Sequence, residues 1–582
     1  MSLNPGITIL KFGSSVLRSE RDFPLSVHEV YRAWRHGSRV VAVVSALGST
    51  TDDLLKRAEQ LGLPPKPMAL ASLLATGEAT AAALLALHLH RSGIPATNLD
   101  PAQAGLLTRG EPLDAEPVGL DRARILRELD RGVVVLPGFV GRDFAGRTTL
   151  LGRGGSDFTA LYLAHELGGR CVLLKDVDGL YTADPNLPGS RARRYASLDW
   201  GTAIRAGGAV VQEKSLRFAE AVGLELTVTA PGAPAGTLIG PGPVRTVPPR
   251  PQPPPLRVAL LGCGTVGGGV LERLLALRRF FEVVGVAVRD PRRERVPAVP
   301  RSLLNGDASE LLDRPADVVV ELVGGVDLPQ RWIGRALAAG RHVVTANKAL
   351  LANGIDALHG LAAGCGVRLL CSASVGGALP ALETVRRAAA AGPVRSVSGV
   401  LNGTSNFVLE EIADGKSLRR AVAEAMRLGF AEADPTLDLD GTDAAQKLSL
   451  LAREAFGIPL DHHELERRGI ERLDEETIAV LRSSDRTVRL VACCRRASRG
   501  LTGSVAPRVL PQDHPFARTR GAWNCLEVEL ESGVRITLSA QGAGRWPTTE
   551  AVLADLFDLV RLRSAGGAKH QVAGRETVEV AQ

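Results

Sequence analysis

A proline-rich segment divides the chain into two parts that must fold separately. Eight of the fifteen residues from 241 to 255 are proline. Proline fixes φ and lacks a backbone N–H, so this density excludes a helix or a central strand and is typical of a semi-rigid extended linker. We therefore predict one folded unit over residues 1–240, a linker over residues 241–255 and further domains after it.

The composition is that of a folded chain in water. Apolar residues make up 45% and charged residues 23% of 582 residues, which excludes disordered and fibrous classes. The net charge of +7 is small and no long block of like charge occurs, so we expect neither nucleic acid nor a membrane as partner. The apolar run over residues 69–89 contains Glu78 and two threonines, which favours a core helix over a membrane span.

The cysteines and the first residues indicate a cytoplasmic location. The seven cysteines form no CxxC pair and their number is odd, as in proteins of reducing compartments. The first ten residues lack the basic and apolar regions of a signal peptide. We expect a cytoplasmic protein that acts on small molecules.

The first unit alternates short buried strands with helices. The β-rich apolar runs are Ile7–Phe12, Arg39–Ser45, Gly132–Pro137, Cys171–Asp176 and Leu224–Val228. Helical stretches lie between them, for example over residues 52–61 and 157–167. This alternation predicts an α/β unit built on a parallel sheet.

The second unit opens with a pattern for binding a dinucleotide. A GxGxxG run follows an apolar strand, Leu256–Leu261, and opens a helix; it consists of Gly262, Cys263, Gly264, Thr265, Val266 and Gly267. Its glycines allow a tight turn and close approach of a pyrophosphate, and the helix N-terminus supplies N–H groups. The βα regularity ends near residue 382. We predict a Rossmann domain over residues 256–382 and an α+β domain over 383–582, whose last helix returns to the Rossmann domain.

Basic residues follow the second strand of this pattern. Arg289 stands where an acid usually binds the ribose 2′-hydroxyl, and Arg292 and Arg293 are close to it. A basic cluster there suits a 2′-phosphate, so NADP(H) is favoured while NAD is still possible. The alternative is a solvated basic loop without a ligand.

Lysine is scarce in this chain, which gives weight to the positions that have it. Only nine of the 70 basic residues are lysine, and two of the nine, Lys348 and Lys447, lie near a group of carboxylates. Asp443 and Lys447 are four residues apart in an expected helix, hence on one face. A surface ion pair is the alternative, but the flanking alanines and leucines indicate a buried helix.

At these residues the second unit resembles homoserine dehydrogenase. The matching stretches are residues 262–267, 319–325, 343–350, 401–407, 432–447, 514–517 and 542–547, in the order of that family. The resemblance implies NADP(H)-dependent interconversion of aspartate semialdehyde and homoserine, with assembly into a homodimer or higher oligomer through this half of the chain.

The resemblance also implies roles for individual residues. Lys447 is the implied proton donor, and Lys348 lies beside the nicotinamide and the substrate. The implied substrate ligands are Glu432, Asp438 and Asp443, and the implied cofactor contacts beyond the glycine run are Arg289, Val323, Lys348, Gly429 and Gly542. Carbonyl reduction needs a cation or an acid at the developing alkoxide, which a desolvated lysine supplies.

The same family binds a monovalent cation, Na⁺ or K⁺, through backbone carbonyls of a loop. The corresponding carbonyls here belong to Ser372, Val375, Gly377 and Leu379. Many members carry an acid where this chain has Ser372. Because the carbonyls themselves remain, the site is still expected.

Three loops of the first unit favour binding of a nucleotide. Lys11 is followed by Gly13, Ser14 and Ser15 at the end of the first strand, and such small residues beside a lysine can surround a phosphate. A glycine-rich run holds Arg153, Ser156 and Asp157, suited to an anion. An acidic loop over residues 176–185 suits a nucleotide or its Mg²⁺. A single glycine-rich loop is usually an ordinary turn, but three such loops at strand ends of one sheet favour a phosphoryl-transfer site.

Together these loops resemble the amino-acid kinase fold, specifically aspartate kinase, over residues 5–240. The resemblance implies transfer of the γ-phosphoryl group of ATP to the β-carboxylate of aspartate. Lys11 is implied to stabilise that group, with Gly13, Ser14 and Ser15 around it. The implied substrate ligands are Thr51, Glu78, Arg153 and Ser156, and the implied nucleotide contacts are Asp176 and Tyr181.

The first unit departs from this family at several positions. Its lysine–glycine run is one residue short, Lys175 replaces a threonine, and Val210 replaces a lysine. Lys175 and Lys214 are candidates to supply the missing charge. Two alternatives to a bifunctional enzyme follow: a dehydrogenase whose first half is a structural or ligand-binding module, and a non-catalytic metabolite sensor.

The spacing of the motifs also leaves little room for a regulatory domain. Only 15 residues separate Gly240 from Leu256, and 19 follow Arg563. A minimal domain core needs several tens of residues. We expect any inhibition by threonine or lysine to be weak and competitive.

Overall fold

The computed structural model describes residues 6–61, 64–207, 210–250, 253–295, 298–428, 430–431, 434–498 and 500–572. The chain forms two compact units. One contains Pro255–Leu556 together with Ser92–Ile94, and the other contains the chain up to Arg91, Pro95–Pro254 and the part of the chain from Phe557 onward. We call them the C-terminal and the N-terminal unit.

The N-terminal unit is built on a nine-stranded sheet in the order β13-β10-β12-β11-β9-β1-β2-β6-β3. Its strands are β1 Ile7–Phe12, β2 Arg39–Val44, β3 Ala96–Asn98, β6 Val133–Pro137, β9 Arg170–Leu174, β10 Arg194–Leu198, β11 Leu226–Thr229, β12 Thr237–Ile239 and β13 Arg245–Val247. The central pairs β9–β1, β1–β2 and β2–β6 are parallel. The predicted parallel α/β unit is therefore confirmed.

Helices and a second, smaller sheet complete this unit. The helices are α1 Phe23–Arg35, α2 Thr50–Glu59, α3 Pro67–Arg91, α4 Arg122–Leu129, α5 Gly155–Leu167, α6 Trp200–Gly207 and α7 Glu213–Ala221. The four-stranded sheet has the order β5-β4-β7-β8, with β4 Leu107–Glu111, β5 Asp114–Gly119, β7 Val140–Arg142 and β8 Thr148–Leu150. Buried apolar side chains of β1, β2, β6, β9 and α5 form the main core.

The apolar run over residues 69–89 lies in α3. Among the described residues, α3 is the one helix that is long and apolar enough to cross a membrane, and half of its most apolar window is buried inside the protein. Ten of its residues are buried, including Leu74, Glu78 and Leu85. This burial is that of a core helix.

The segment expected as a linker contributes one strand. β13 occupies residues 245–247, which contain no proline, and pairs antiparallel with β10 at the edge of the large sheet. An edge position is where a proline-flanked strand can pair without a full set of N–H donors.

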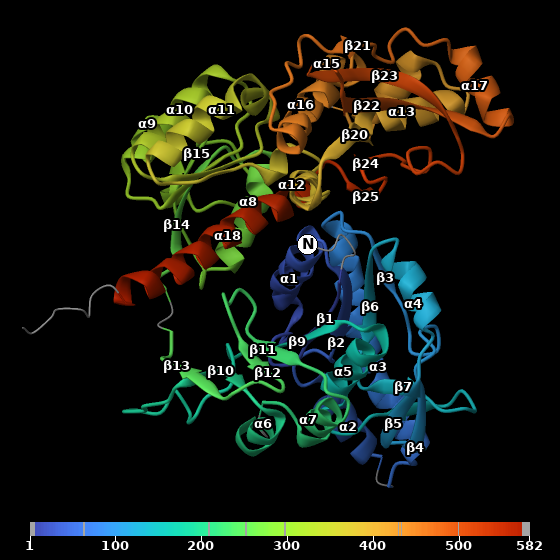
Figure 1. Cartoon of the computed structure of the whole chain (residues 1–582), viewed down its shortest axis with the longest axis vertical. Coiled ribbons are helices and arrows are strands. Elements are labelled where there is room, and N and C mark those ends of the chain that lie inside the picture. Colours follow the sequence, from blue (N-terminus) through green and yellow to red (C-terminus); the bar gives the residue numbers. More distant parts are fainter. Residues whose placement is uncertain are drawn as a thin grey trace, which may run out of the picture. The chain divides into compact units, whose positions relative to one another are not determined.

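The C-terminal unit begins with a six-stranded parallel sheet in the order β16-β15-β14-β17-β18-β19. Its strands are β14 Leu256–Leu261, β15 Phe281–Ala287, β16 Leu304–Asn305, β17 Val318–Glu321, β18 His342–Thr345 and β19 Leu369–Leu370. The helices are α8 Thr265–Ala276, α9 Ala308–Asp313, α10 Asp327–Ala338 and α11 Lys348–Gly364, and Figure 1 shows α9, α10 and α11 grouped over this sheet. This is the doubly wound arrangement expected from the glycine motif.

A mixed sheet follows, in the order β21-β23-β22-β20-β24-β25. Its strands are β20 Val394–Val400, β21 Glu466–Arg467, β22 Arg486–Arg496, β23 Leu501–Pro511, β24 Trp523–Leu530 and β25 Arg535–Gln541. The helices of this part are α12 Ala381–Ala391, α13 Gly403–Ala413, α14 Leu418–Arg427, α15 Thr436–Leu439, α16 Thr442–Phe456, α17 Glu475–Ser483 and α18 Arg545–Val572. This combination of a mixed sheet and helices is the expected α+β fold.

Candidate functional site

The two lysines of the C-terminal unit meet on one carboxylate. Lys447 Nζ lies 2.7 Å from Asp443 Oδ2, and Lys348 Nζ lies 3.1 Å from Asp443 Oδ1. Asp443 and Lys447 come from the first two turns of α16, whereas Lys348 is the first residue of α11. Burial opposes ionisation of Asp443, but the charges of Lys447 and Lys348 outweigh it and hold the pKa of this carboxyl well below its usual range.

The ammonium group of Lys447 is only partly used by the protein. It donates to the Leu401 carbonyl oxygen at 2.7 Å as well as to Asp443, and its side chain is 10% exposed. An ammonium has three N–H donors, so these two contacts leave one for a substrate oxygen. The lysine is thus nearly buried, oriented and still able to donate.

Asn402, to which the sequence analysis assigns no role, hydrogen-bonds to two of the acids of this site. Asn402 Nδ2 donates to Asp438 Oδ1 at 2.6 Å and to Asp443 Oδ2 at 2.8 Å, while its Oδ1 accepts from Ser405 N at the start of α13. Burial and the charge of Asp443 raise the pKa of Asp438. The structure therefore brings Asp438, Asp443, Lys348 and Lys447 together, as expected. Glu432 and Gly429 lie outside the described residues.

The glycine motif forms the turn that its spacing predicts. Gly262 has φ +95°, and a Cβ there would lie 2.8 Å from the Leu322 carbonyl oxygen. A Cβ on Gly267 would lie 2.3 Å from the Gly262 carbonyl oxygen, whereas one on Gly264 would meet nothing within 4 Å. Helix α8 begins at Thr265, inside the glycine run, so Thr265 and Val266 lie in its first turn. This close packing at a helix N-terminus fits a pyrophosphate.

The basic cluster after β15 is exposed, and it includes Arg295, which the sequence analysis does not predict as a member. Arg289, Arg292 and Arg293 all face solvent. Arg295 donates to the Asp290 carbonyl oxygen at 2.7 Å, and its charge opposes the burial that raises the pKa of the Cys263 thiol in the glycine turn. Arg295 stands six residues after Arg289, so the run of arginines itself was the signal that could have found it.

A buried acid fixes the next loop of the same sheet. Glu321, at the end of β17, accepts from the backbone N–H of Val323 at 2.8 Å and of Gly324 at 3.1 Å. It also accepts from the Thr345 hydroxyl at 2.7 Å, at the end of β18. Val323 is half exposed at this edge of the sheet, just before α10. The carboxyl ends of β14, β17 and β18 thus present the expected cofactor residues along one edge.

The loop expected to bind a monovalent cation is closely tied to the rest of the unit. Gly376 and Gly377 have φ +87° and +57°, and a Cβ on Gly377 would lie 2.8 Å from the backbone of Gly542. The Ser372 hydroxyl lies 2.5 Å from Glu383 Oε1 and 2.6 Å from Asp555 Oδ1. Two carboxylates from other helices therefore bring negative charge to the position where many relatives have an acid. Val375 and Leu379 are buried in the same loop.

In the N-terminal unit, two lysines again share one aspartate. Asp157 Oδ1 lies 2.7 Å from Lys11 Nζ and Asp157 Oδ2 lies 2.8 Å from Lys175 Nζ. Lys11 is the last residue but one of β1, Lys175 follows β9 and Asp157 is in the first turn of α5. Burial lowers the pKa of Lys11, although Asp157 opposes this; burial would raise the pKa of Asp157, but the two lysines outweigh it and lower that pKa.

A buried glutamate lies close to this pair. Glu78 is 3% exposed on α3, and burial raises its pKa to about 7, with the Ala46 backbone and the charge of Lys11 opposing the rise. Its Oε2 has no hydrogen-bond partner among the described residues. A buried carboxylate without a full set of donors is costly, so a ligand with N–H groups would stabilise it.

The other expected residues of this unit surround that centre at different depths. Ser156 is buried beside Asp157, whereas Arg153, Ser14, Ser15 and Asp176 are exposed. Thr51 lies in the first turn of α2. The Tyr181 hydroxyl donates to Asp178 Oδ1 at 2.7 Å, and burial raises the pKa of Tyr181 to about 12. A Cβ on Gly13 would lie 3.2 Å from Lys11 Nζ, which places this glycine against the ammonium group.

Lys214 occupies a different place from Lys175. Its Nζ lies 2.7 Å from Asp114 Oδ1 and 3.4 Å from the Leu151 carbonyl oxygen, at the start of the glycine-rich run. Asp114 also lies against that run, since a Cβ on Gly152 would lie 2.2 Å from its Oδ1. Lys175, not Lys214, is the lysine that shares a carboxylate with Lys11.

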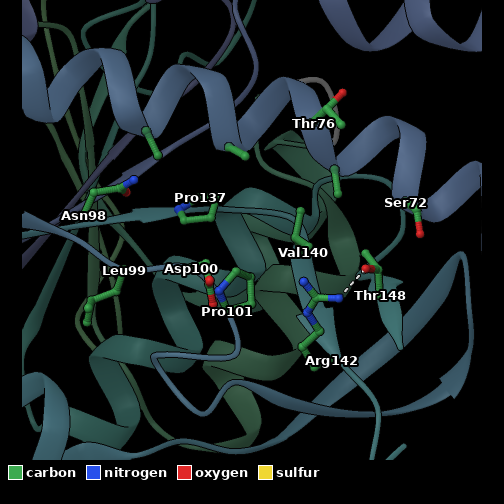
Figure 2. A pocket seen from close by; sticks show the side chains of 13 residues that line it. Ser72, Thr76, Asn98, Leu99, Asp100, Pro101, Pro137, Val140, Arg142 and Thr148 are labelled. Carbon is green, nitrogen blue, oxygen red and sulfur yellow. Dashed lines mark hydrogen bonds between the residues drawn. The ribbon is translucent and has the colours of Figure 1, made fainter. Parts of the chain in front are cut away.

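A cavity of about 230 Å³ opens elsewhere in the N-terminal unit. It lies against α3 and the strands β7 and β8, and contains none of the expected site residues. Figure 2 shows Arg142 in its wall, donating to the Thr148 hydroxyl at 2.6 Å. This cavity is distinct from the Lys11 centre.

Comparison with known proteins identifies the C-terminal unit. Residues 380–557 match the family model for homoserine dehydrogenase, and residues 262–372 match the model for the NAD-binding domain of homoserine dehydrogenase. The homoserine dehydrogenase of Corynebacterium glutamicum is 37% identical over 325 residues, which are 53% of this chain and 73% of the relative. The chain belongs to the homoserine dehydrogenase family. The homoserine dehydrogenase of Pseudomonas aeruginosa is 36% identical over 318 residues, covering 53% of this chain and 73% of that protein.

A solved structure and a further family model complete the comparison. A homoserine dehydrogenase from Thiobacillus denitrificans is 36% identical with a TM-score of 0.51, and the match covers 53% of this chain and 74% of that one. Residues 6–229 match the amino acid kinase family. The chain is thus a homoserine dehydrogenase with a nicotinamide-nucleotide domain, fused to an amino acid kinase domain. We call its two parts the dehydrogenase half and the kinase half.

Proposed function

We propose that the dehydrogenase half interconverts aspartate semialdehyde and homoserine with NADP(H), and that the kinase half phosphorylates the β-carboxylate of aspartate with ATP. The contact of Lys447 with both Asp443 and the Leu401 carbonyl oxygen carries the first assignment. The shared contact of Lys11 and Lys175 with Asp157 carries the second. Each cluster belongs to the half of the chain that matches the corresponding family.

In the dehydrogenase half, Lys447 acts on the carbonyl oxygen of the substrate. The bound cofactor supplies the hydride. The free N–H of Lys447 donates to that oxygen and passes a proton to the alkoxide as it forms. Asp443 holds the ammonium in place through the 2.7 Å contact, and the Leu401 carbonyl fixes its direction. In the reverse direction the same lysine accepts the proton from the hydroxyl group.

Lys348 and the remaining acids orient the substrate. Lys348 begins α11 at the end of β18 and its side chain is 38% exposed, so it can reach a ligand while it contacts Asp443. Asp438 and Asp443, with Glu432 by resemblance, bind the amino and hydroxyl ends of the substrate. Gly262, Gly264 and Gly267 would hold the pyrophosphate of the cofactor, Val323 and Gly542 would contact the cofactor, and Arg289 would bind the 2′-phosphate.

Substitution of Lys447 by alanine tests the dehydrogenase assignment. The variant should lose at least about a hundredfold in kcat for homoserine oxidation, the usual contribution of a general acid or base. Formation of the reduced cofactor is followed by its absorbance. Binding of NADPH, measured by fluorescence, should be unchanged, because Lys447 contacts the substrate. Near-normal turnover would remove Lys447 from this role.

In the kinase half, the two lysines stabilise the phosphoryl group in transfer. Asp157 holds both ammonium groups within 2.8 Å, so they converge on one region at the ends of β1 and β9. Phosphoryl transfer depends mainly on positioning and on neutralising negative charge. Gly13, Ser14 and Ser15 line the phosphates, Asp176 and Tyr181 contact the nucleotide, and exposed acids of the same loop would hold Mg²⁺. Thr51, Glu78, Arg153 and Ser156 bind aspartate.

Release of ADP that depends on aspartate tests the kinase assignment. The purified chain should release ADP with ATP, Mg²⁺ and L-aspartate, and Lys11→Ala should abolish this release. Lys66→Ala is the control, because Lys66 is an exposed lysine of the same half outside the proposed site. Absence of ADP release from the parent protein would support the alternative in which this half is only structural.

Two further features complete the proposal. The loop of Ser372, Val375, Gly377 and Leu379 binds Na⁺ or K⁺ through its carbonyls, with Glu383 and Asp555 supplying charge nearby. Homodimerisation occurs through the dehydrogenase half, where β25 is the edge strand of the mixed sheet. Activation of homoserine oxidation by KCl or NaCl, compared with choline chloride, tests the cation site. Light scattering of the full chain tests homodimerisation.

A further inference from the structure

The loop after α16 brings three potential metal ligands together. Asp461, His462 and His463 each offer one ligand atom, and these atoms all lie within 4.8 Å of one another. His462 Nδ1 lies 4.0 Å from Asp461 Oδ1, and the two imidazole rings have centroids 4.0 Å apart. Among the described residues, this is the one such group of three.

His462 is the unusual member of the group. Its side chain is 3% exposed, and its Nδ1 has no hydrogen-bond partner among the described residues. A buried ring nitrogen without a partner costs free energy, and such a group needs an explanation.

We propose that Asp461, His462 and His463 form a binding site for a divalent transition-metal ion of the Zn²⁺ class. Two imidazole nitrogens and one carboxylate oxygen suit Zn²⁺, Ni²⁺, Co²⁺ or Cu²⁺, whereas Mg²⁺ and Ca²⁺ prefer oxygen ligands alone. Asp461 Oδ1 accepts a hydrogen bond from the backbone N–H of His463 at 2.8 Å, which holds the carboxylate close to His463. Three protein ligands leave the remaining positions to water.

A metal ion at this site would hold in place the loop after α16, which contacts α15 beside the proposed substrate ligand Asp438. After His463 the chain forms β21, which pairs with β23. It then returns to α15, where Ile470 N donates to the Leu439 carbonyl oxygen at 2.8 Å, next to Asp438. A bound ion would therefore restrict the motion of the loop that leads from the end of α16 to the contact with Leu439. The site is separate from the residues proposed for either reaction.

Calorimetric titration of the full chain with Zn²⁺ tests the proposal, on protein without a histidine tag and first treated with a chelator. We expect one Zn²⁺ per chain with micromolar or tighter affinity. His463→Ala and Asp461→Asn are exposed substitutions and should each weaken binding at least tenfold. Glu464→Gln is the matched control, because Glu464 is an exposed neighbour outside the group. Circular dichroism and homoserine oxidation confirm that each variant is folded.

The nature of the ligands has an independent readout. Cu²⁺ bound to the parent protein should show nitrogen hyperfine coupling in its electron paramagnetic resonance spectrum, and His463→Ala should reduce that coupling. No Zn²⁺ binding, or equal binding by the parent and by His463→Ala, would overturn the proposal. Equal weakening by Glu464→Gln would also overturn it, because binding would then reflect general surface charge.

Discussion

At the scale of single residues, both halves use one buried aspartate to hold two lysines. Asp443 holds Lys348 and Lys447, and Asp157 holds Lys11 and Lys175. Bringing two ammonium groups together is unfavourable unless a carboxylate neutralises part of their charge, and burial strengthens that attraction. The scarcity of lysine pointed to Lys348 and Lys447, but the pairing of Lys175 with Asp157 could not be predicted because it joins residues 18 apart through the fold.

We predict that ionisation of Glu78 governs how the stability of the kinase half depends on pH. Its folded pKa of about 7 lies above the ordinary value of 4.5. The folded state then binds the proton more tightly, so stability is lost as pH rises from about 4.5 to 7, by up to about 3 kcal/mol. Glu78→Gln should remove this loss, which urea unfolding of the kinase half at pH 5 and pH 8 measures. An unchanged pH dependence in the variant would contradict the assignment.

We predict that Arg289 sets the cofactor preference of the dehydrogenase half. A charge-assisted hydrogen bond to the 2′-phosphate contributes about 1–3 kcal/mol, so Arg289→Glu should reduce or reverse the preference for NADPH over NADH. The ratio of kcat/KM for the two cofactors measures this. Arg419→Glu is the control, because it makes the same charge change at an exposed position of α14. Equal kcat/KM for both cofactors in the parent protein would count against the role of Arg289.

At the scale of elements, the first strands of the two βα regions have the bounds that the sequence predicts. The expected strands Ile7–Phe12 and Leu256–Leu261 form with those bounds, because continuous apolar runs are typical of strands buried on both faces. The four-stranded sheet of β4, β5, β7 and β8 was not predicted. β4 and β5 are partly exposed, and β7 and β8 have only three residues each, so these strands carry little periodic signal. The carboxylates beside Ser372 were not predicted either, since Asp555 lies 183 residues away.

We predict that two glycines of the same turn differ in what they tolerate. A Cβ on Gly267 would lie 2.3 Å from the Gly262 carbonyl oxygen, so Gly267→Ala should displace α8 from β14 and lower the melting temperature. Gly264 has φ −83° and open space around it, so Gly264→Ala should keep the melting temperature. It should nevertheless raise the KM for NADPH, because the added methyl group enters the space for the pyrophosphate. Unchanged KM for NADPH in Gly264→Ala would place the cofactor elsewhere.

At the scale of the whole molecule, each cluster is complete within its own compact unit. Lys11, Asp157 and Lys175 belong to the N-terminal unit, and Lys348, Asp443 and Lys447 belong to the C-terminal unit. The product of the proposed kinase reaction is an acyl phosphate, which must be reduced to an aldehyde before the dehydrogenase can use it. The two clusters among the described residues are assigned to the reactions before and after this reduction, and the reduction itself is assigned to neither.

We predict from this separation that the two reactions are independent in one chain. Lys447→Ala should abolish homoserine oxidation and leave aspartate-dependent ADP release at the parent rate, whereas Lys11→Ala should do the reverse. An equimolar mixture of the two variants should then show half of the parent's specific activity in each reaction. A kinase rate that changes in Lys447→Ala, or that responds to saturating homoserine and NADP⁺, would show that the clusters are coupled. Because each cluster is formed, among the residues that the structure describes, by side chains of its own unit, we expect neither response.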